Sequence, residues 1–327
     1  MYDLIEIKKV NKIKIAVLVL ASIIFIIFAT LGGIKLAKYE KKREYYRALK
    51  RQEEIERLAE EEKKKEEEAK QQAIIQKRIE QTSRELTDEE KDRILHIYRS
   101  TGEKRVFLTF DDGPSESVTP LILDLLKKEN VKATFFTLGG NVKAHPELAK
   151  REFDEGHYVA NHGYSHKYSS VYESPEATLN EYNTTEQAIK DALGNQNYRS
   201  NLFRFPGGSN GGYYDEAKQN SKALLKENGV VHLDWNCLSQ DAAGAHTKEA
   251  LLQNVKDTMG EKDSLVILMH DSSDKILTYE MLSDLINLLR DKGYKFENIY
   301  DLLDWKNWWR KKVNSISWKF IVHSKKF

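Results

Sequence analysis

Short apolar segments alternate with amphipathic segments along most of the chain after residue 105. The apolar segments with strand-like composition are residues 106–110, 132–138, 158–161, 202–205, 230–233 and 264–269. Helical patterns occupy the intervals, near residues 118–129, 147–155, 176–193, 214–227, 248–259 and 279–291. A helix between successive strands is typical of a parallel β-sheet. The alternation therefore predicts an α/β domain whose sheet is either open or closed into a barrel.

A capping box precedes the first of these strands. Thr87 is placed to cap a helix N-terminus, and Glu90 stands at the third helical position, where its side chain bonds back to the cap. We expect this helix to continue to about Arg99. The segment from residue 82 to residue 304 has roughly the length of one barrel domain. We therefore expect residues 82–304 to form a single domain.

Residues 15–34 form an uncharged apolar run between Lys14 and Lys35. About twenty helical residues span about 30 Å, the thickness of the hydrocarbon core of a bilayer. A cleaved signal peptide has a shorter apolar region, of about 7–15 residues, followed by small residues at the cleavage site. Neither property fits, so we expect an uncleaved transmembrane helix after a short N-terminal segment, residues 1–14. Lysines flank both ends of the run, and the positive-inside rule therefore does not fix its orientation.

Residues 35–81 consist largely of Lys, Arg, Glu, Gln and Ala, without Gly or Pro. Pairs such as Glu60 and Lys64 are four residues apart in the order that favours a solvated helix. The few apolar residues do not hold a heptad, so no coiled coil is predicted. We expect a charged spacer that is helical or partly disordered. Across the whole chain, 52 Lys and Arg balance 51 Asp and Glu, which excludes a uniformly basic protein that binds nucleic acid.

The last segment, residues 305–327, holds four of the five tryptophans and seven Lys or Arg, with no acidic residue. One interpretation is an interfacial helix that contacts anionic lipid or wall polymer. The other is a terminal helix that packs its aromatic stripe on the domain. The chain has a single cysteine, Cys237, which excludes an intramolecular disulfide and is expected to be a small core residue.

Polar side chains of unusual type follow the predicted strands. The first strand leads into Asp111 and Asp112, followed by Gly113 and Pro114. Two adjacent carboxylates repel each other, and a cation that binds one of them relieves the repulsion. The alternative is an ordinary polar turn, because Asp, Gly and Pro are all common turn residues.

The third strand is followed by His162 and His166, four residues apart. Two imidazoles at this spacing can bind one Zn²⁺ ion, and Asp112 would complete a ligand set that leaves a position open for water. No Glu follows the first histidine, so the H-E-x-x-H motif of metalloproteases is absent. Arg204 and His270 end two further strands, where each is either a site residue or an ordinary strand-end residue.

Five motifs in this order resemble those of the polysaccharide deacetylases, the NodB-homology group also called carbohydrate esterase family four. The motifs are TFDDGP (109–114), HGYSH (162–166), RFPGG (204–208), DWNCLSQDA (234–242) and LMH (268–270). The resemblance implies a distorted (β/α) barrel and a divalent metal ion, most often zinc. It also implies hydrolysis of acetyl groups on cell-wall polysaccharide.

The resemblance implies a role for each residue of the site. Asp112, His162 and His166 would be the metal ligands, and Asp111 would be the general base. Arg204 would orient Asp111 and tune its acidity.

The remaining implied roles lie in the third to fifth motifs. The backbone N–H of Gly207 would stabilise the oxyanion, and Leu268 would line the pocket for the acetyl methyl group. His270 would be the general acid, and Asp241 would pair with it and keep it protonated. The histidines at positions 145, 157, 232 and 246 match no motif position, so we do not expect them in the site.

Two positions depart from the family pattern. Ala242 stands where a Trp usually follows the motif aspartate, and Gly163 stands where Ser or Thr is usual. The catalytic residues of the family pattern are therefore all present, whereas one aromatic wall of the sugar groove is not. Peptidoglycan N-acetylglucosamine is the leading expectation, as in the membrane-anchored peptidoglycan deacetylases that the chain resembles, and it would place the domain outside the cytoplasm. The alternatives are muramic acid residues, poly-N-acetylglucosamine, chitin oligomers, acetylxylan, a metal-independent glycoside hydrolase and a catalytically silent wall-binding protein. The sequence indicates no nucleic-acid partner, and it does not identify a protein partner.

Overall fold

The computed structural model describes residues 2–244 and 246–303. The chain divides into two compact units, Met1–Gln72 and Ala73–Phe327, which we describe separately. The Trp-rich segment 305–327, for which two interpretations were given above, lies outside the described residues.

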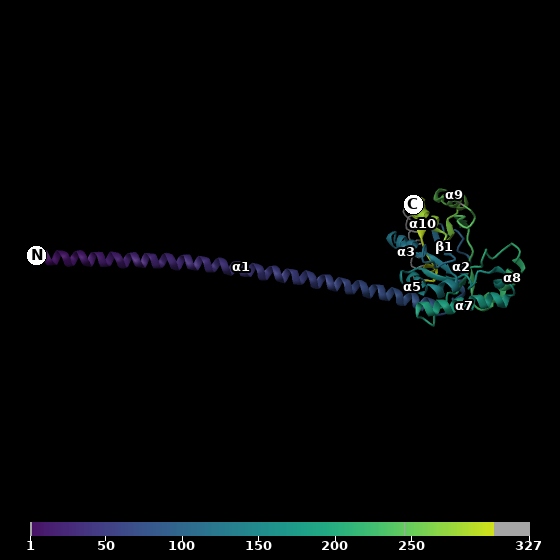
Figure 1. Cartoon of the computed structure of the whole chain (residues 1–327), viewed down its shortest axis with the longest axis horizontal. Helices are drawn as coiled ribbons and strands as arrows, with labels where there is room; N and C mark the ends of the chain where they lie inside the picture. The colour runs from purple at the N-terminus through teal and green to yellow at the C-terminus, as the bar shows by residue number, and fades with distance from the viewer. Residues whose placement is uncertain (1, 245, 304–327) are drawn as a thin grey trace, which may run out of the picture. The chain divides into compact units, whose positions relative to one another are not determined.

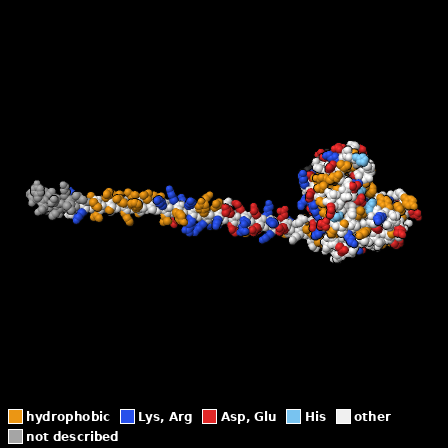
Figure 2. Space-filling model, in the orientation of Figure 1, with side chains coloured by type: hydrophobic (Ala, Val, Ile, Leu, Met, Phe, Trp, Pro, Cys, Tyr) orange, Lys and Arg blue, Asp and Glu red, His pale blue; other side chains and the backbone are white. Residues whose placement is uncertain are grey.

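The first unit consists of most of helix α1 (Tyr2–Thr82). The apolar run 15–34 lies on this helix with its large side chains exposed, and the helix is long and apolar enough to cross a membrane. Figure 2 shows these apolar side chains in orange, followed by the blue and red side chains of the spacer. The hydroxyls of Ser22 and Thr30 donate to backbone carbonyls one turn earlier in the helix, as a lipid environment requires of polar groups.

The charged spacer is helical, which was one of the two expected outcomes. Its long side chains pair along the helix surface: Arg57 contacts both Glu54 and Glu61, and Lys70 contacts Glu66. All of these side chains are exposed, so each pair contributes only about 0.3–0.5 kcal/mol to the helix. The stability of the spacer therefore comes from many weak local pairs rather than from a buried core.

The second unit begins inside α1, ahead of the boundary at residue 82 that we expected. Ile75 and Ile79 pack against the buried side chains of the domain. The Arg78 guanidinium lies over the Tyr300 ring, 5.9 Å from its centroid, and the Thr82 carbonyl accepts a hydrogen bond of 2.6 Å from the Arg199 N–H. The last turns of α1 are therefore part of the domain.

The second unit is built on a parallel β-sheet with the strand order β5-β4-β3-β2-β1-β7-β6. The strands are β1 (Arg105–Asp111), β2 (Thr134–Thr137), β3 (Tyr158–Asn161), β4 (Leu202–Phe203), β5 (Val231–His232), β6 (Cys237–Leu238), β7 (Ser264–His270) and β8 (Lys295–Phe296). β8 pairs with the start of β1, and β2 pairs with its end. Among the described strands, none joins β5 to β6, so the sheet forms an incomplete barrel. The expected α/β fold and distorted barrel are confirmed.

Helices surround this sheet (Figure 1). They are α2 (Asp88–Leu95), α3 (Thr119–Lys128), α4 (Gly139–Ala144), α5 (Pro146–Asp154), α6 (Tyr168–Val171), α7 (Pro175–Leu193), α8 (Asp215–Glu227), α9 (Lys248–Met259), α10 (Ile276–Asp291) and α11 (Ile299–Leu303). The capping box of Thr87 and Glu90 is confirmed, with both reciprocal hydrogen bonds formed. Helix α2 ends at Leu95, earlier than the expected end near Arg99, because the chain turns there.

Alternate residues of β1 face two different cores. Val106, Leu108 and Phe110 belong to a cluster shared with α3, α9 and α10, whereas Phe107 belongs to a second cluster shared with α2, α7 and α11. Successive strand residues point to opposite faces of a sheet. Asp111 therefore lies on the face of Phe107, at the carboxyl end of the strand.

Cys237 is buried in the first of these clusters, as expected of a small core residue. Its thiol contacts the Thr258 hydroxyl at 3.4 Å. Burial raises the pKa of this thiol, so it stays protonated and unreactive at neutral pH.

Candidate active site

Asp111 and Asp112 are adjacent in the sequence, and β1 ends between them. Asp111 is the last strand residue and is buried. Asp112 follows with a φ of 73°, which turns its side chain away from the sheet and toward the loop after β3. Its backbone carbonyl accepts a hydrogen bond of 2.8 Å from the Asn141 amide on α4. This bond and the turn hold Asp112 in place.

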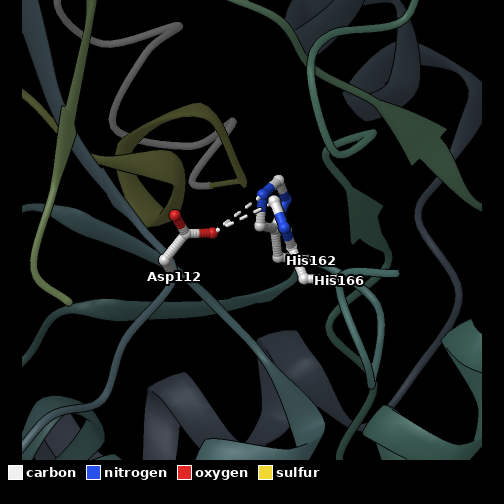
Figure 3. A group of neighbouring side chains, drawn as sticks. All are labelled: Asp112, His162 and His166. Carbon is white, nitrogen blue, oxygen red and sulfur yellow. Dashed lines mark ion pairs between the residues drawn. The ribbon is translucent and has the colours of Figure 1, made fainter. Parts of the chain in front are cut away.

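The two histidines after β3 face the Asp112 carboxylate (Figure 3). One Asp112 oxygen, Oδ1, lies 3.4 Å from Nε2 of His162 and 3.4 Å from Nε2 of His166. Nδ1 of His162 lies 2.8 Å from the backbone oxygen of Arg204. Because a carbonyl only accepts hydrogen bonds, Nδ1 carries the proton and Nε2 keeps a lone pair.

These three side chains could hold a metal ion. One ligand atom from each of Asp112, His162 and His166 lies within 4.8 Å of the others. The Asp112 Oδ1 atom is buried and, among the described residues, has no hydrogen-bond partner. An unsatisfied buried carboxylate oxygen between two imidazole nitrogens is the arrangement that a divalent cation relieves. The donor set therefore fits a metal of the zinc class.

The surroundings of Asp112 and His166 favour the protonation states in which these side chains bind a metal ion. Burial alone would raise the pKa of the Asp112 carboxyl, but the His162 and His166 imidazoles, when protonated, outweigh burial and hold that pKa well below its usual range. Burial lowers the pKa of the His166 imidazole. An ionised carboxylate and neutral imidazoles are the protonation states that bind metals.

Arg204 lies beneath Asp111 and is fully buried. Its Nη1 donates to the Asp111 carboxylate at 2.7 Å and to the Thr109 hydroxyl at 2.7 Å. Its Nε and Nη2 donate to the backbone carbonyls of Leu233 and Asp234. A buried guanidinium with this many partners has one available position, so it fixes the orientation of the Asp111 carboxylate.

The loop after β4 carries Gly207, which has a φ of 74°. The Asp234 carboxylate holds the next turn of this loop, because it accepts from both the N–H and the hydroxyl of Ser209. A Cβ atom at Gly207 would overlap the Tyr168 hydroxyl. The backbone conformation therefore favours glycine at this position, and any larger residue would also displace the Tyr168 side chain.

His270 ends β7, and its register partner on the neighbouring strand is Asp111. Its Nδ1 lies 2.8 Å from one Asp241 carboxylate oxygen, and its backbone N–H donates to the other at 2.8 Å. The Thr278 hydroxyl donates to the same carboxylate. Leu268 lies two residues earlier on β7 and is almost fully buried. Paired strand residues project from one face of a sheet, so the structure brings His270 and Asp111 to the same end of the same face.

Comparison with known proteins identifies the family. The profile described as polysaccharide deacetylase matches residues 98–229. The chain is 35% identical over 214 residues to a peptidoglycan-N-acetylglucosamine deacetylase of Bacillus cereus, an alignment that covers 62% of this chain and 72% of that protein. The chain belongs to the polysaccharide deacetylase family. The resemblance seen in the five motifs is therefore confirmed.

Two further comparisons show how much of this polysaccharide deacetylase is matched by its relatives. The peptidoglycan-N-acetylglucosamine deacetylase PgdA of Listeria monocytogenes is 34% identical over 214 residues, which cover 64% of this chain and 41% of PgdA. A solved structure of a CE4 esterase from Streptococcus mutans has a TM-score of 0.56 and 31% identity, covering 65% of this chain and 91% of that structure. This chain thus spans less than half the length of PgdA but nearly all of the esterase.

The sequence did not reveal several residues that hold the site together. Glu181 on α7 accepts from the backbone N–H groups of Tyr164 and Ser165 and from the Ser165 hydroxyl, so it anchors the loop between the two histidines. Gly163, in this loop, has a φ of 81°. Glu181 therefore supplies a loop contact that Gly163, without a side chain, cannot make. Glu181 lies in an ordinary helical pattern, and no signal in the sequence marks it.

Proposed function

We propose that this polysaccharide deacetylase hydrolyses the N-acetyl groups of N-acetylglucosamine residues in peptidoglycan. The observation that carries the proposal is the register pairing of Asp111 with His270, beside the group formed by Asp112, His162 and His166. A carboxylate held by a buried arginine can serve as the base of amide hydrolysis. An imidazole held by a buried carboxylate can serve as its acid.

The substrate is supported by the names of the relatives. Both the Bacillus cereus and the Listeria monocytogenes proteins are named as peptidoglycan-N-acetylglucosamine deacetylases. We also propose that α1 crosses the cell membrane and that the catalytic domain lies outside the cytoplasm, where this polymer is located. The apolar run 15–34 supports the membrane anchor, and the substrate rather than the flanking charge supports the orientation.

We propose that Asp112, His162 and His166 hold a divalent metal ion, and Zn²⁺ suits two imidazoles and one carboxylate best. When bound, such an ion polarises the acetyl carbonyl and makes water more acidic. The hydrogen bond from Nδ1 of His162 to the Arg204 carbonyl fixes the orientation of that ring. The backbone carbonyl of Arg204 therefore orients His162, and the Arg204 guanidinium orients Asp111.

The other residues then divide the remaining steps. Asp111 accepts a proton from the attacking water, and the Arg204 guanidinium holds this carboxylate in position through a hydrogen bond of 2.7 Å. The N–H of Gly207 stabilises the oxyanion as it develops. Leu268 lines the space for the acetyl methyl group. His270 donates a proton to the leaving amine, which would otherwise be a poor leaving group.

The pair of His270 and Asp241 gives the reaction an alkaline limit. Burial lowers the pKa of His270, but the Asp241 carboxylate outweighs burial and raises that pKa to about 9. A general acid acts while it is protonated, so kcat is expected to fall as the pH rises through about 9. In Asp241→Asn the carboxylate that contributes most to raising this pKa is lost while burial remains, so the alkaline limb should move to lower pH.

The pH profile of kcat measures this shift. Thr278→Val is the matched control, because it removes one hydrogen bond to Asp241 and keeps the negative charge. The control should retain an alkaline limb near that of the wild type. If the limb of Asp241→Asn does not move, His270 is not the proton donor.

Acetate release by the full-length protein in detergent tests the function itself. We expect acetate from peptidoglycan and from N-acetylglucosamine oligomers, loss of release after treatment with a chelator, and recovery on addition of Zn²⁺. Acetate from acetylxylan alone would replace the proposed substrate. New reducing ends without acetate would indicate a glycoside hydrolase. Polymer binding without either product would indicate a silent wall-binding protein.

A further inference from the structure

A group of tyrosines extends from the ligand site to the surface of the domain. The Tyr168 ring lies 5.5 Å from the His166 imidazole, and its side chain is partly exposed. Tyr214 follows, with its ring 6.3 Å from that of Tyr168. Tyr213 comes last, with its ring 4.9 Å from that of Tyr214. We call Tyr168, Tyr214 and Tyr213 the tyrosine track.

The tyrosine track packs on a buried side chain, that of Tyr172. Tyr172 is 3% exposed, and its hydroxyl donates to the Pro206 carbonyl at 2.7 Å. Its ring lies 5.8 Å from the Tyr168 ring and 5.5 Å from the Tyr214 ring. The Tyr168 and Tyr214 rings therefore both pack against Tyr172. The three residues of the track come from two separate segments, α6 and the loop before α8.

The outer end of the track contributes little to folding. The Tyr213 side chain is 95% exposed, the most exposed large apolar residue among those described. A single exposed aromatic residue is common and needs no explanation. Tyr213, however, continues a line of rings that begins beside a metal-ligand candidate. Residues 209–212 of the same loop are Ser, Asn, Gly and Gly, so their side chains add little bulk beside the ring, and the Asp215 carboxylate holds the loop by accepting from the Gly211 N–H at 2.6 Å.

We propose that the tyrosine track binds a second sugar ring of the glycan strand, next to the ring whose acetyl group is removed. Pyranose rings present C–H groups on their faces and hydroxyls on their edges, which matches the apolar face and polar tip of tyrosine. Tyrosine also offers a large rigid surface at a low entropic cost. Ala242, which follows Asp241, is exposed and offers no ring. This inference rests on the proposed function, and it predicts a preference for polymer over single sugars.

Binding of N-acetylglucosamine oligomers tests the track. The dissociation constants of a short and a long oligomer are measured on the full-length protein in detergent, in an Asp111→Asn background that prevents turnover. We expect Tyr213→Ala to weaken binding of the long oligomer about tenfold, the size of one aromatic contact. Binding of the short oligomer should change less, because its rings do not reach Tyr213. Tyr213→Phe should restore the long-oligomer affinity, since it keeps the ring.

The matched control is Tyr45→Ala. Tyr45 is also exposed and forms an edge-on pair with its neighbour Tyr46, as Tyr213 does with Tyr214. The control should bind both oligomers like the parent. An equal affinity of parent and Tyr213→Ala for the long oligomer, or an equal loss for both oligomers, overturns the inference. Acetate release by the wild-type protein separates this failure from failure of the proposed function, because without acetate or binding both proposals fall together.

Discussion

Asp111→Asn should lower acetate release by about a thousandfold or more while leaving the proposed metal binding by Asp112, His162 and His166 intact. The side chain keeps its size and can still accept from Arg204, but it can no longer take a proton from water. The Asp111 carboxylate is the group that the Arg204 guanidinium holds at 2.7 Å. The measurement pairs an acetate assay with the metal content of the purified protein.

His162→Ala provides the contrasting variant. It should lose metal and activity together, because His162 is one of three ligand candidates and its ring is fixed by a backbone carbonyl. If Asp111→Asn instead lost its metal, Asp111 would be a ligand rather than the base, and the roles of Asp111 and Asp112 would be exchanged. If it kept most of its activity, the proposed base would be wrong.

Arg204→Met should destabilise the domain by about 3–5 kcal/mol, the usual cost of leaving one partner of a buried ion pair behind. The variant leaves the Asp111 carboxylate buried without its counter-charge, and it leaves the Leu233 and Asp234 carbonyls without their donor. It also removes the guanidinium from the Phe136 ring, where it lies 3.9 Å from the centroid. The midpoint of urea unfolding measures the loss.

A double variant shows whether the buried charge is responsible. Arg204→Met combined with Asp111→Leu removes both members of the ion pair, so it should regain a large part of the lost stability and remain inactive. An unfolding midpoint equal to that of the wild type in Arg204→Met alone would show that the pair contributes nothing to folding. Equal losses in the single and double variants would assign the cost to the carbonyl contacts instead.

The alternation of apolar and amphipathic segments was enough to predict the sheet and its main helices. Strands β1, β3 and β7 agree with the expected segments to within a residue. Two strands were not predicted, Cys237–Leu238 and Lys295–Phe296. Each has two residues, and neither lies in a longer apolar segment of the kind that made the equally short β4 and β5 predictable. The N-terminal limit of the domain was also missed, because Ile75 and Ile79 lie within a charged helical run that gives no sign of a buried face.

The candidate site likewise contains residues that could be predicted from the sequence and residues that could not. Residues whose chemistry is unusual at a strand end could be found from the sequence, and the structure brings Asp111, Asp112 and His270 to one end of the sheet. Arg204 and Asp241, which position Asp111 and His270, were expected from the family motifs, whereas the roles of other residues that hold the loops of the site were not. Glu181 and Asp234 act through backbone groups far away in the sequence, and such contacts exist only in the folded chain.

The ligand candidates belong to different parts of the fold, with Asp112 after β1 and the two histidines after β3. An ion bound there would cross-link two loops that the unfolded chain does not hold together, so it would bind the folded state selectively. A ligand at about a hundredfold excess over its dissociation constant adds about 2.7 kcal/mol to the stability of the state that it binds. The supply of metal ions would then govern how long each molecule resists proteolysis as well as how fast it works.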